Sequence, residues 1–352
     1  MSRQVRVLVL GVGGNVSQGI IKALRGSELN IVLIGACISP SSAGLYLCDS
    51  AFISPYANED VFMPWLIQLC NKEQIDIVLT GVEENINAIM KQYDMFTAGT
   101  TAIFKAVSYD KLVIGQDKYL TCEWLKEHGC NYPEYCLLSD KAAVEKLVSE
   151  IGFPLIAKPR SGKSSKGVVK VTTQEELDAI ADRTDYVLQE CIGTPEDEYT
   201  VGCYCDKNHT FRGAVIMHRK LVNGSTDFAR IVENEAILKE VKKICDAFCP
   251  VGPLNVQLRL DKTGRPVCFE LNVRFSGSTP MRAHFGYEDV KAMIKEYVLE
   301  EDISNCFQTR KGEAYRYVNE IYIEAGAMET MEQNGHITNM ANFAPSIERL
   351  EK

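Results

Sequence analysis

The chain carries the stretch PLNVQLRLDKTGRPVCFELNVRF at residues 253–275. Two apolar runs with period-two alternation flank the turn at residues 261–264, which predicts a β-hairpin. The second strand places four side chains on one face at alternate positions, namely Cys268, Glu270, Asn272 and Arg274. Gln257 can point to the same face from the first strand. Because an acid, amides and a guanidinium are costly to bury without partners, this row predicts either a binding site or a water-facing sheet.

The polar row has the chemistry of a metal and phosphate site. Carboxylate and carboxamide oxygens are ligands that Mg²⁺ accepts alongside phosphate oxygens and water, with Mn²⁺ as an alternative ion. The candidate metal ligands are therefore Gln257, Glu270 and Asn272. Arg274 could neutralise a transferring phosphoryl group. The loop that follows adds hydroxyl and backbone N–H groups at Ser276, Gly277 and Ser278.

A second segment suited to phosphates precedes this hairpin. Residues 154–159 and 168–171 are predicted strands on either side of the small and basic loop RSGKSSKG at residues 160–167. Such a hairpin can close over phosphates, although a flexible basic surface hairpin has the same pattern. A Walker A loop is excluded, because Ala157 occupies its glycine position and a strand, not a helix, follows the lysine.

The first hundred residues alternate short apolar runs with helical stretches, which predicts a parallel sheet covered by helices. The first run, Val5–Leu10, leads into the glycine loop Gly11–Asn15. A dinucleotide site is excluded, because Val16 replaces the third glycine of the fingerprint and no acid follows the second strand. We expect a Rossmann-like layer without NAD.

Composition limits the partners. A length of 352 residues predicts at least two domains, and 38 basic against 47 acidic side chains give a net charge of -9. This balance excludes sequence-independent nucleic-acid binding or an anionic membrane surface as the main interaction. The 13 cysteines are scattered without zinc spacing, and no apolar run approaches the length of a membrane span. We expect reduced thiols in a cytoplasmic protein.

Taken in order, six segments resemble the ATP-grasp superfamily, and most closely one ATP-binding half of the carbamoyl-phosphate synthase large subunit. These segments are Asp117-Lys118, Ile156–Pro159 with its loop, Gln189–Ile192, Glu198–Val201, Asn255–Gln257 and Glu270–Ser278. The similarity covers roughly residues 1–300, because Val5–Gly19 and Ile75–Ile89 also resemble the domain that precedes the nucleotide domain in this family.

The resemblance implies an α/β fold with α+β character in the clamp. A Rossmann-like pre-ATP-grasp domain would occupy residues 1–110, and a two-subdomain ATP-grasp fold would occupy residues 111–300, with its lid at about 125–190. Residues 301–352 would form a C-terminal strand and tail. Alternation predicts a strand at Glu313–Ile323, and the last thirty residues fit a helix or a loosely packed tail.

The resemblance also implies an ATP site. The phosphates would be met from opposite sides of the lid by Lys118 and Lys158, with help from Lys163 and Lys166. The loop over the triphosphate would include Gly162, Ser164, Ser165 and Gly167. The segment at adenine would be Gln189, Glu190, Cys191 and Ile192, with Glu198 at the ribose. One or two Mg²⁺ ions would be held by Gln257, Glu270 and Asn272, and Arg274 would stabilise the γ-phosphoryl.

Candidate substrate residues are less specific. Lys220 is instead a candidate catalytic residue, because it lies in a basic segment that related enzymes direct at the acceptor carboxylate or γ-phosphate. Among the substrate residues, Arg282 could fix a substrate carboxylate. Glu83 follows a parallel strand at its carboxyl end and could hold an amine, although an acid at a helix N-terminus is the competing interpretation. Ser276, Gly277 and Ser278 complete the predicted substrate set.

The resemblance implies a carboxylate–amine ligase in which ATP phosphorylates a carboxylate and an amine attacks the acylphosphate. The chain contains one ATP-binding half and no Gly-x-Cys-x-Gly elbow, so a full carbamoyl-phosphate synthase reaction is not expected. A carboxylate- or bicarbonate-phosphorylating enzyme and a non-catalytic ATP-binding regulatory subunit stay open. The expected partners are small-molecule carboxylates and amines, with no nucleic acid and no membrane, and a homodimer is a possible assembly.

Overall fold

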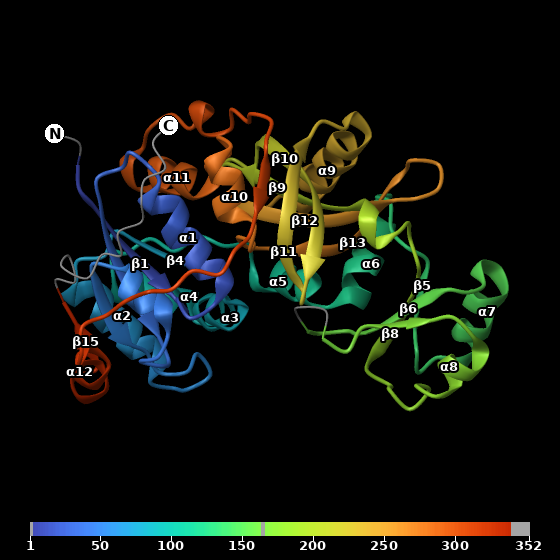
Figure 1. The fold of residues 1–352 in the computed structure, drawn as a ribbon, viewed down its shortest axis with the longest axis horizontal. Coiled ribbons are helices and arrows are strands. Elements are labelled where there is room, and N and C mark those ends of the chain that lie inside the picture. Colours follow the sequence, from blue (N-terminus) through green and yellow to red (C-terminus); the bar gives the residue numbers. More distant parts are fainter. Residues whose placement is uncertain (1–2, 163–165, 339–352) are drawn as a thin grey trace. The chain divides into compact units, whose positions relative to one another are not determined.

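The computed structural model describes residues 3–162 and 166–338. The chain forms two compact units, the first with one sheet and the second with two (Figure 1). Within the described residues, unit 1 comprises 3–106, 274–309 and 317–338, and unit 2 comprises 107–273 and 310–316. The expected ranges 1–110, 111–300 and 301–352 are consecutive, whereas these units interleave, because the chain returns to unit 1 after Val273.

Unit 1 is built on a five-stranded sheet with the order β15-β3-β2-β1-β4. Its strands are β1 (Val5–Leu10), β2 (Ile31–Cys37), β3 (Ser50–Ile53), β4 (Ile77–Thr80) and β15 (His336–Ile337). The first four pair in parallel, and β15 adds an antiparallel edge. Most residues of β1, β2 and β4 are buried, as expected of a parallel sheet covered on both faces. The predicted Rossmann-like layer is confirmed.

Helices surround this sheet. They are α1 (Asn15–Arg25), α2 (Phe62–Lys72), α3 (Glu83–Lys91), α4 (Tyr93–Gly99), α10 (Thr279–His284), α11 (Asp289–Ile294) and α12 (Ala327–Asn334), with the short turns η1 (Ala43–Leu47), η3 (Lys295–Leu299) and η4 (Ser304–Cys306). Gly11 has φ +66°, and a Cβ atom there would lie 2.4 Å from Val82 Cγ2. The turn from β1 into α1 therefore needs glycine at this position.

Unit 2 contains two sheets. The larger has the order β13-β12-β9-β10-β11-β14, with β9 (Glu198–Cys205), β10 (Phe211–Val222), β11 (Ser225–Val232), β12 (Gly252–Leu260), β13 (Pro266–Asn272) and β14 (Glu313–Tyr315). The smaller has the order β5-β8-β6-β7, with β5 (Tyr135–Leu137), β6 (Leu155–Pro159), β7 (Val169–Val171) and β8 (Tyr186–Glu190). All neighbours pair antiparallel, and both predicted hairpins, β6-β7 and β12-β13, are confirmed.

The helices of unit 2 are α5 (Tyr109–Gln116), α6 (Lys118–Glu127), α7 (Lys141–Ile151), α8 (Gln174–Asp178) and α9 (Glu235–Phe248), with the short turn η2 (Pro195–Asp197). The smaller sheet packs against α7 and α8 through a core that includes Leu147, Leu155 and Leu177. This body lies within residues 125–190, for which a lid is predicted.

The strand predicted at Glu313–Ile323 is mostly wrong. Only Glu313–Tyr315 form a strand, because they pair with β11, to which the backbone N–H of Arg316 adds one last hydrogen bond at Asp227 O. Beyond them the chain has no regular structure up to α12, and Tyr317 and Val318 are exposed. Alternation alone does not make a strand where no neighbouring edge supplies hydrogen bonds.

Candidate active site

One cavity in unit 2 is lined by residues that lie between positions 118 and 270. Ten predicted nucleotide or metal residues line it: Lys118, Lys158, Gly162, Lys166, Gln189, Glu190, Ile192, Glu198, Gln257 and Glu270. Its apolar wall includes Ile156, Val168, Leu221 and Phe269. Charged and amide groups that converge on a partly apolar cavity are typical of a small-molecule site. Ser164 and Ser165, like Lys163, lie outside the described residues.

Lys158 is the buried cation of this cavity. Its side chain lies on β6 at 7% exposure, and Nζ is 5.2 Å from the centre of the Phe269 ring. Burial lowers the pKa of Lys158 to about 8, because removal from water disfavours the charged form. A phosphate placed beside Nζ would supply the missing counter-charge.

Lys118 joins the loop after β6 to the start of α6. Asp117 caps α6 by accepting from the backbone N–H of Tyr119 and of Leu120, and it also binds Arg160 at 2.6 Å. Lys118 Nζ donates to the carbonyl of Gly162 at 3.1 Å. The base of the glycine loop is therefore fixed to the helix that carries the predicted phosphate lysine.

Two glycines bound this loop. Gly162 has φ +144° and Gly167 has φ +76°, values that side-chain-bearing residues rarely adopt. A Cβ atom on Gly167 would also lie 2.8 Å from the hydroxyl oxygen of Tyr186. These positions therefore require glycine for conformational reasons.

The segment predicted to contact adenine ends β8. Gln189 is buried, and its side chain donates to Cys122 Sγ at 3.0 Å, while its backbone lies between β5 and β6. The Glu190 backbone N–H donates to Glu134 O at 2.8 Å. Cys191 is half-buried and Ile192 is buried just past the strand. Contact of this segment with a base stays a prediction.

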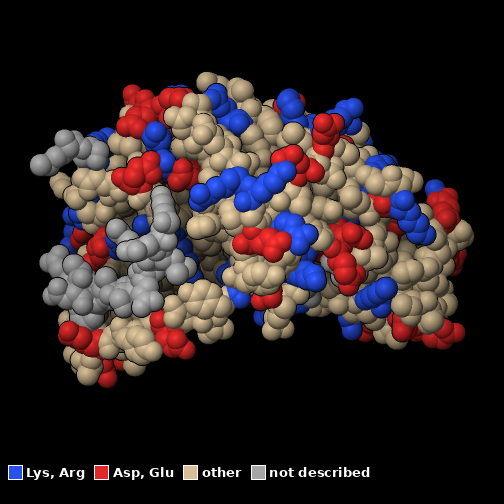
Figure 2. Space-filling view, turned by 45° about the horizontal axis from the view of Figure 1, so that its top comes forward, with Lys and Arg blue, Asp and Glu red and all other residues tan. Residues whose placement is uncertain are grey.

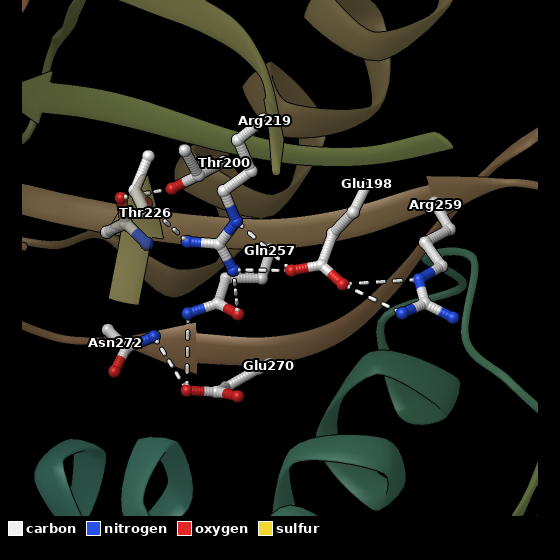
Figure 3. Close-up of polar contacts among 9 residues, drawn as sticks. Glu198, Thr200, Arg219, Thr226, Gln257, Arg259, Glu270 and Asn272 are labelled. Atoms are coloured by element: carbon white, nitrogen blue, oxygen red, sulfur yellow. Dashed lines mark hydrogen bonds and ion pairs between the residues drawn. The ribbon is translucent and has the colours of Figure 1, made fainter. Parts of the chain in front are cut away.

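Glu198 lies between two arginines (Figure 3). One carboxylate oxygen accepts from Arg219 at 2.6 Å, and the other accepts from Arg259 at 2.8 Å. Burial alone would raise the pKa of Glu198, but the charges and hydrogen bonds of Arg219 and Arg259 outweigh it and lower the pKa. The carboxylate is therefore held ionised and in one orientation.

The three predicted metal ligands come together on β12 and β13. Gln257 lies opposite Glu270, and Asn255 lies opposite Asn272. The amide groups of Asn272 and Gln257 both donate to Glu270 Oε1, at 2.9 and 3.4 Å (Figure 3). The described residues contain no cluster of three or more His, Cys, Asp or Glu that could hold a metal. One carboxylate with amides fits an ion that takes most of its ligands from phosphate and water.

The predicted row is wrong at both of its ends. A β-bulge inserts Phe269, so Gln257 opposes Glu270 while Leu258 opposes Cys268. The extra residue turns Cys268 to the opposite face, where it is fully buried. At the other end β13 stops at Asn272, so Arg274 lies beyond the strand rather than on its face.

Arg274 belongs to unit 1, where it pairs with Glu83 at the start of α3. The distance from Arg274 Nη2 to Glu83 Oε1 is 2.7 Å. The structure thus brings together two predicted site residues that sequence analysis treated separately. Their roles toward phosphate and amine stay predictions.

The predicted substrate loop after Arg274 is buried. Ser276 and Ser278 share a hydrogen bond between their hydroxyls at 2.9 Å, and a Cβ atom on Gly277 would lie 3.0 Å from Asn15 Nδ2. Arg282 has no exposed side-chain surface, donates to Ser276 Oγ and is paired with Asp289. This corrects the expectation that Arg282 is available to a substrate, because its charge is already neutralised inside unit 1.

Two further residues of the charge network, Arg219 and Arg259, were not among the predicted site residues. Strand alternation places Arg219 on the same face of β10 as Leu221, which lines the cavity, and leaves the predicted catalytic Lys220 exposed on the other face. Arg259 lies two residues after Gln257 on β12. The alternation that identified Gln257 would therefore also have identified Arg259.

Comparison with known proteins identifies the parts of the chain. Residues 115–278 match the ATP-grasp domain, and residues 7–104 match the PylC-like N-terminal domain. A D-alanine–D-alanine ligase of Bacteroides fragilis is 35% identical over 109 residues, which are 29% of this chain and 31% of that enzyme. The match thus spans about a third of the length of that relative.

Two longer matches have lower identity. The carbamoyl phosphate synthase large chain of Campylobacter jejuni is 23% identical over 295 residues, which are 74% of this chain and 25% of that protein. The crystal structure of an L-amino acid ligase from Bacillus licheniformis superposes with a TM-score of 0.66 and 16% identity, covering 94% of this chain and 86% of that chain. At this identity the structural match supports the fold.

Two surface features complete the description. On the face drawn in Figure 2, basic and acidic side chains are interspersed, without an extended field of one sign among the described residues. Among residues 3–162 and 166–338, no helix is both long and apolar enough to cross a membrane.

Proposed function

Because the chain belongs to the ATP-grasp superfamily, we propose that it is an ATP-dependent carboxylate–amine ligase that makes an amide or peptide bond through an acylphosphate. The observation that carries this proposal is that Lys118, Lys158 and Glu270 line one and the same cavity. Cations on one side and a metal-ligating carboxylate on the other are what a polyphosphate with its metal ion requires.

In the proposed ATP complex, Lys118 and Lys158 bind the phosphates, Gln189 to Ile192 contact adenine and Glu198 accepts from the ribose hydroxyls. Glu270 and Asn272 would hold a Mg²⁺ ion, and Gln257 lies opposite Glu270 on the neighbouring strand. When bound, Mg²⁺ would neutralise charge on the phosphates. The glycine loop at residues 162–167 would exclude water that could hydrolyse the acylphosphate.

The proposed reaction has two steps. A carboxylate oxygen attacks the γ-phosphorus, and the bond to ADP breaks. The amine nitrogen then attacks the acylphosphate carbonyl carbon, the carbon–oxygen bond breaks, and phosphate leaves as the amine loses a proton. Arg274 would stabilise the transferring phosphoryl group, and Glu83 and the loop at residues 276–278 are the proposed substrate contacts.

A carbamoyl-phosphate-synthase-like enzyme that phosphorylates bicarbonate or a carboxylate is the second candidate. The similarity to the synthase large chain favours this candidate, because the matched region covers 74% of this chain. A non-catalytic subunit is less consistent with the retained set of Lys158, Glu270 and Asn272.

We also propose small-molecule partners, a homodimer, and a cytoplasmic location in which the 13 free thiols stay reduced.

The test is a screen of amino acids and dipeptides in pairs for ADP release in the presence of ATP and Mg²⁺. Ligase activity predicts ADP release that requires both a carboxylate and an amine. ADP formed equally well without any amine would support the second candidate instead. Absence of ADP release with every pair and with bicarbonate would contradict both catalytic functions.

A further inference from the structure

Arg219 is the least accessible cation of the charged network in Figure 3. Its side chain is 8% exposed, and that of its partner Glu198 is 7% exposed. Besides binding Glu198, Arg219 Nη2 donates to Gln257 Oε1 at 2.7 Å. Arg219 therefore joins the carboxylate proposed for the ribose to the amide beside the proposed metal ion.

The contact with Arg219 fixes which way the Gln257 amide points. A guanidinium has only donors, so the group that faces it must be the amide oxygen. A carboxylate has only acceptors, so the group that faces Glu270 must be the amide nitrogen, which lies 3.4 Å from Glu270 Oε1. Both ends of the side chain are therefore assigned by their partners.

This orientation bears on the metal ligands. To coordinate a cation, Gln257 would have to share Oε1 between the metal ion and the positive charge of Arg219. Glu270 Oε1 accepts from two amides, whereas Glu270 Oε2 and Asn272 Oδ1 accept no hydrogen bond from the described residues. These two oxygens are thus the ones available to a divalent cation.

We propose that Arg219 is a positioning residue for the metal site: it orients the Gln257 amide so that its nitrogen holds Glu270, while Glu270 and Asn272 provide the protein ligands. Gln257 then supports a ligand rather than being one. Partners that hold a ligand in this way typically change metal affinity by about 10- to 100-fold when removed. This inference rests on the proposed ATP-dependent function.

The test measures Mn²⁺ binding to the protein–ADP complex by electron paramagnetic resonance, with Mn²⁺ held by free ADP subtracted. The variants are Arg219→Met, Gln257→Met, the double variant and Asn272→Leu. Arg259→Met is the matched control, because it removes the other arginine from Glu198 without touching Gln257. Thermal unfolding of each variant checks that it is folded.

We expect Arg219→Met and Gln257→Met each to raise the Mn²⁺ dissociation constant about tenfold. The double variant should bind Mn²⁺ no more weakly than either single variant, because both changes remove the same support from Glu270. Asn272→Leu should cause a larger loss, and Arg259→Met should leave Mn²⁺ affinity within about twofold of the unchanged protein, although it weakens ADP binding.

Other results would overturn the proposal. Unchanged or tighter Mn²⁺ binding in Arg219→Met, combined with a loss in Gln257→Met as large as in Asn272→Leu, would make Gln257 a ligand. If the losses of Mn²⁺ affinity added up in the double variant, Arg219 and Gln257 would act on the metal site independently of each other. An equal loss in Arg259→Met would assign the effect to Glu198. Because no turnover is measured, a failed ligase screen would not produce any of these outcomes.

Discussion

Arg219 in unit 2 and Arg282 in unit 1 are both buried arginines, and each belongs to a charge network. The network of Arg219 faces a cavity, whereas that of Arg282 does not. Arg219 binds Glu198, which is also bound by Arg259, and Glu198 and Arg259 line the cavity. Arg282 and Asp289 have no exposed side-chain surface. Burial of charge is common to both networks, so access to a cavity, not burial, marks the functional one.

The two carboxylates also differ in their pKa. Burial raises the pKa of Asp289, and its one arginine offsets this only in part. Glu198 has two arginines, which overcome the effect of burial and lower its pKa. A second cation thus holds Glu198 fully charged at the cavity, whereas the Arg282–Asp289 pair serves to order the loop that contains Ser276.

The largest expected effect is loss of stability when the sealed pair is broken. Asp289→Ala leaves Arg282 charged and unpaired, which should lower the free energy of unfolding by about 3–5 kcal/mol. Urea denaturation measures this loss. The matched double variant Arg282→Met with Asp289→Leu should recover most of it, and a double variant as unstable as the single one would show that the unpaired charge is not the cause.

The next largest effect is on turnover. Glu270→Ala should lower the rate of ADP release about a hundredfold or more, equivalent to about 2.7 kcal/mol of transition-state stabilisation, because it removes the only carboxylate of the proposed metal site. Steady-state kinetics with the pair found in the screen measures this. The free energy of unfolding should not fall, in contrast to Asp289→Ala. Full activity would remove the role assigned to Glu270.

Lys158 should give opposite pH dependences for binding and stability. Its pKa of about 8 in the folded protein lies below the ordinary value of 10.5, so the unfolded chain binds more protons between these values. The free energy of unfolding should therefore rise with pH from about 8 to 10.5. ATP affinity should fall about tenfold from pH 7 to pH 9, because the charged form binds phosphate.

Calorimetric titration with ATP and urea denaturation at several pH values measure these two trends. Lys158→Met provides the control, since it should lose both dependences. If ATP affinity and the free energy of unfolding changed in the same direction with pH, Lys158 would not be the cause. The same conclusion would follow if Lys158→Met kept both pH dependences.

The smallest expected effect is at an exposed pair. The distance from Arg230 Nε to Glu313 Oε1 is 2.7 Å, and the two side chains are 54% and 44% exposed. Glu313→Ala should change the free energy of unfolding by less than about 1 kcal/mol, because water screens such pairs. Urea denaturation checks this. A loss as large as that of Asp289→Ala would mean that burial does not govern the contrast between the networks.

Sequence patterns predicted the fold and the grouping of Gln257, Glu270 and Asn272 because side-chain alternation is a local property of a strand. The same rule failed at Cys268, because a bulge adds one residue without any mark in the periodicity. It also failed past Asn272, where the strand ends. Bulges and strand ends depend on the partner strand, which the local pattern does not contain.

Long-range partners were the other limit. The position of Arg282 after a polar loop indicated a residue available to a substrate carboxylate, yet Asp289 neutralises it inside unit 1. The residues next to Arg219 in the sequence, His218 and Lys220, did not indicate its role. That role depends on contacts with Glu198 and Gln257, which lie on other strands. Charged residues can be assigned a role only when their partners are known.

The most direct test of the acylphosphate ligase is oxygen transfer from the carboxylate to phosphate. With the substrate pair found in the screen, the carboxylate is labelled with ¹⁸O on both oxygens, and released phosphate is analysed by mass spectrometry. The account predicts one ¹⁸O atom in each phosphate, since the attacking carboxylate oxygen leaves with it. Unlabelled phosphate accompanying amide formation would contradict the account.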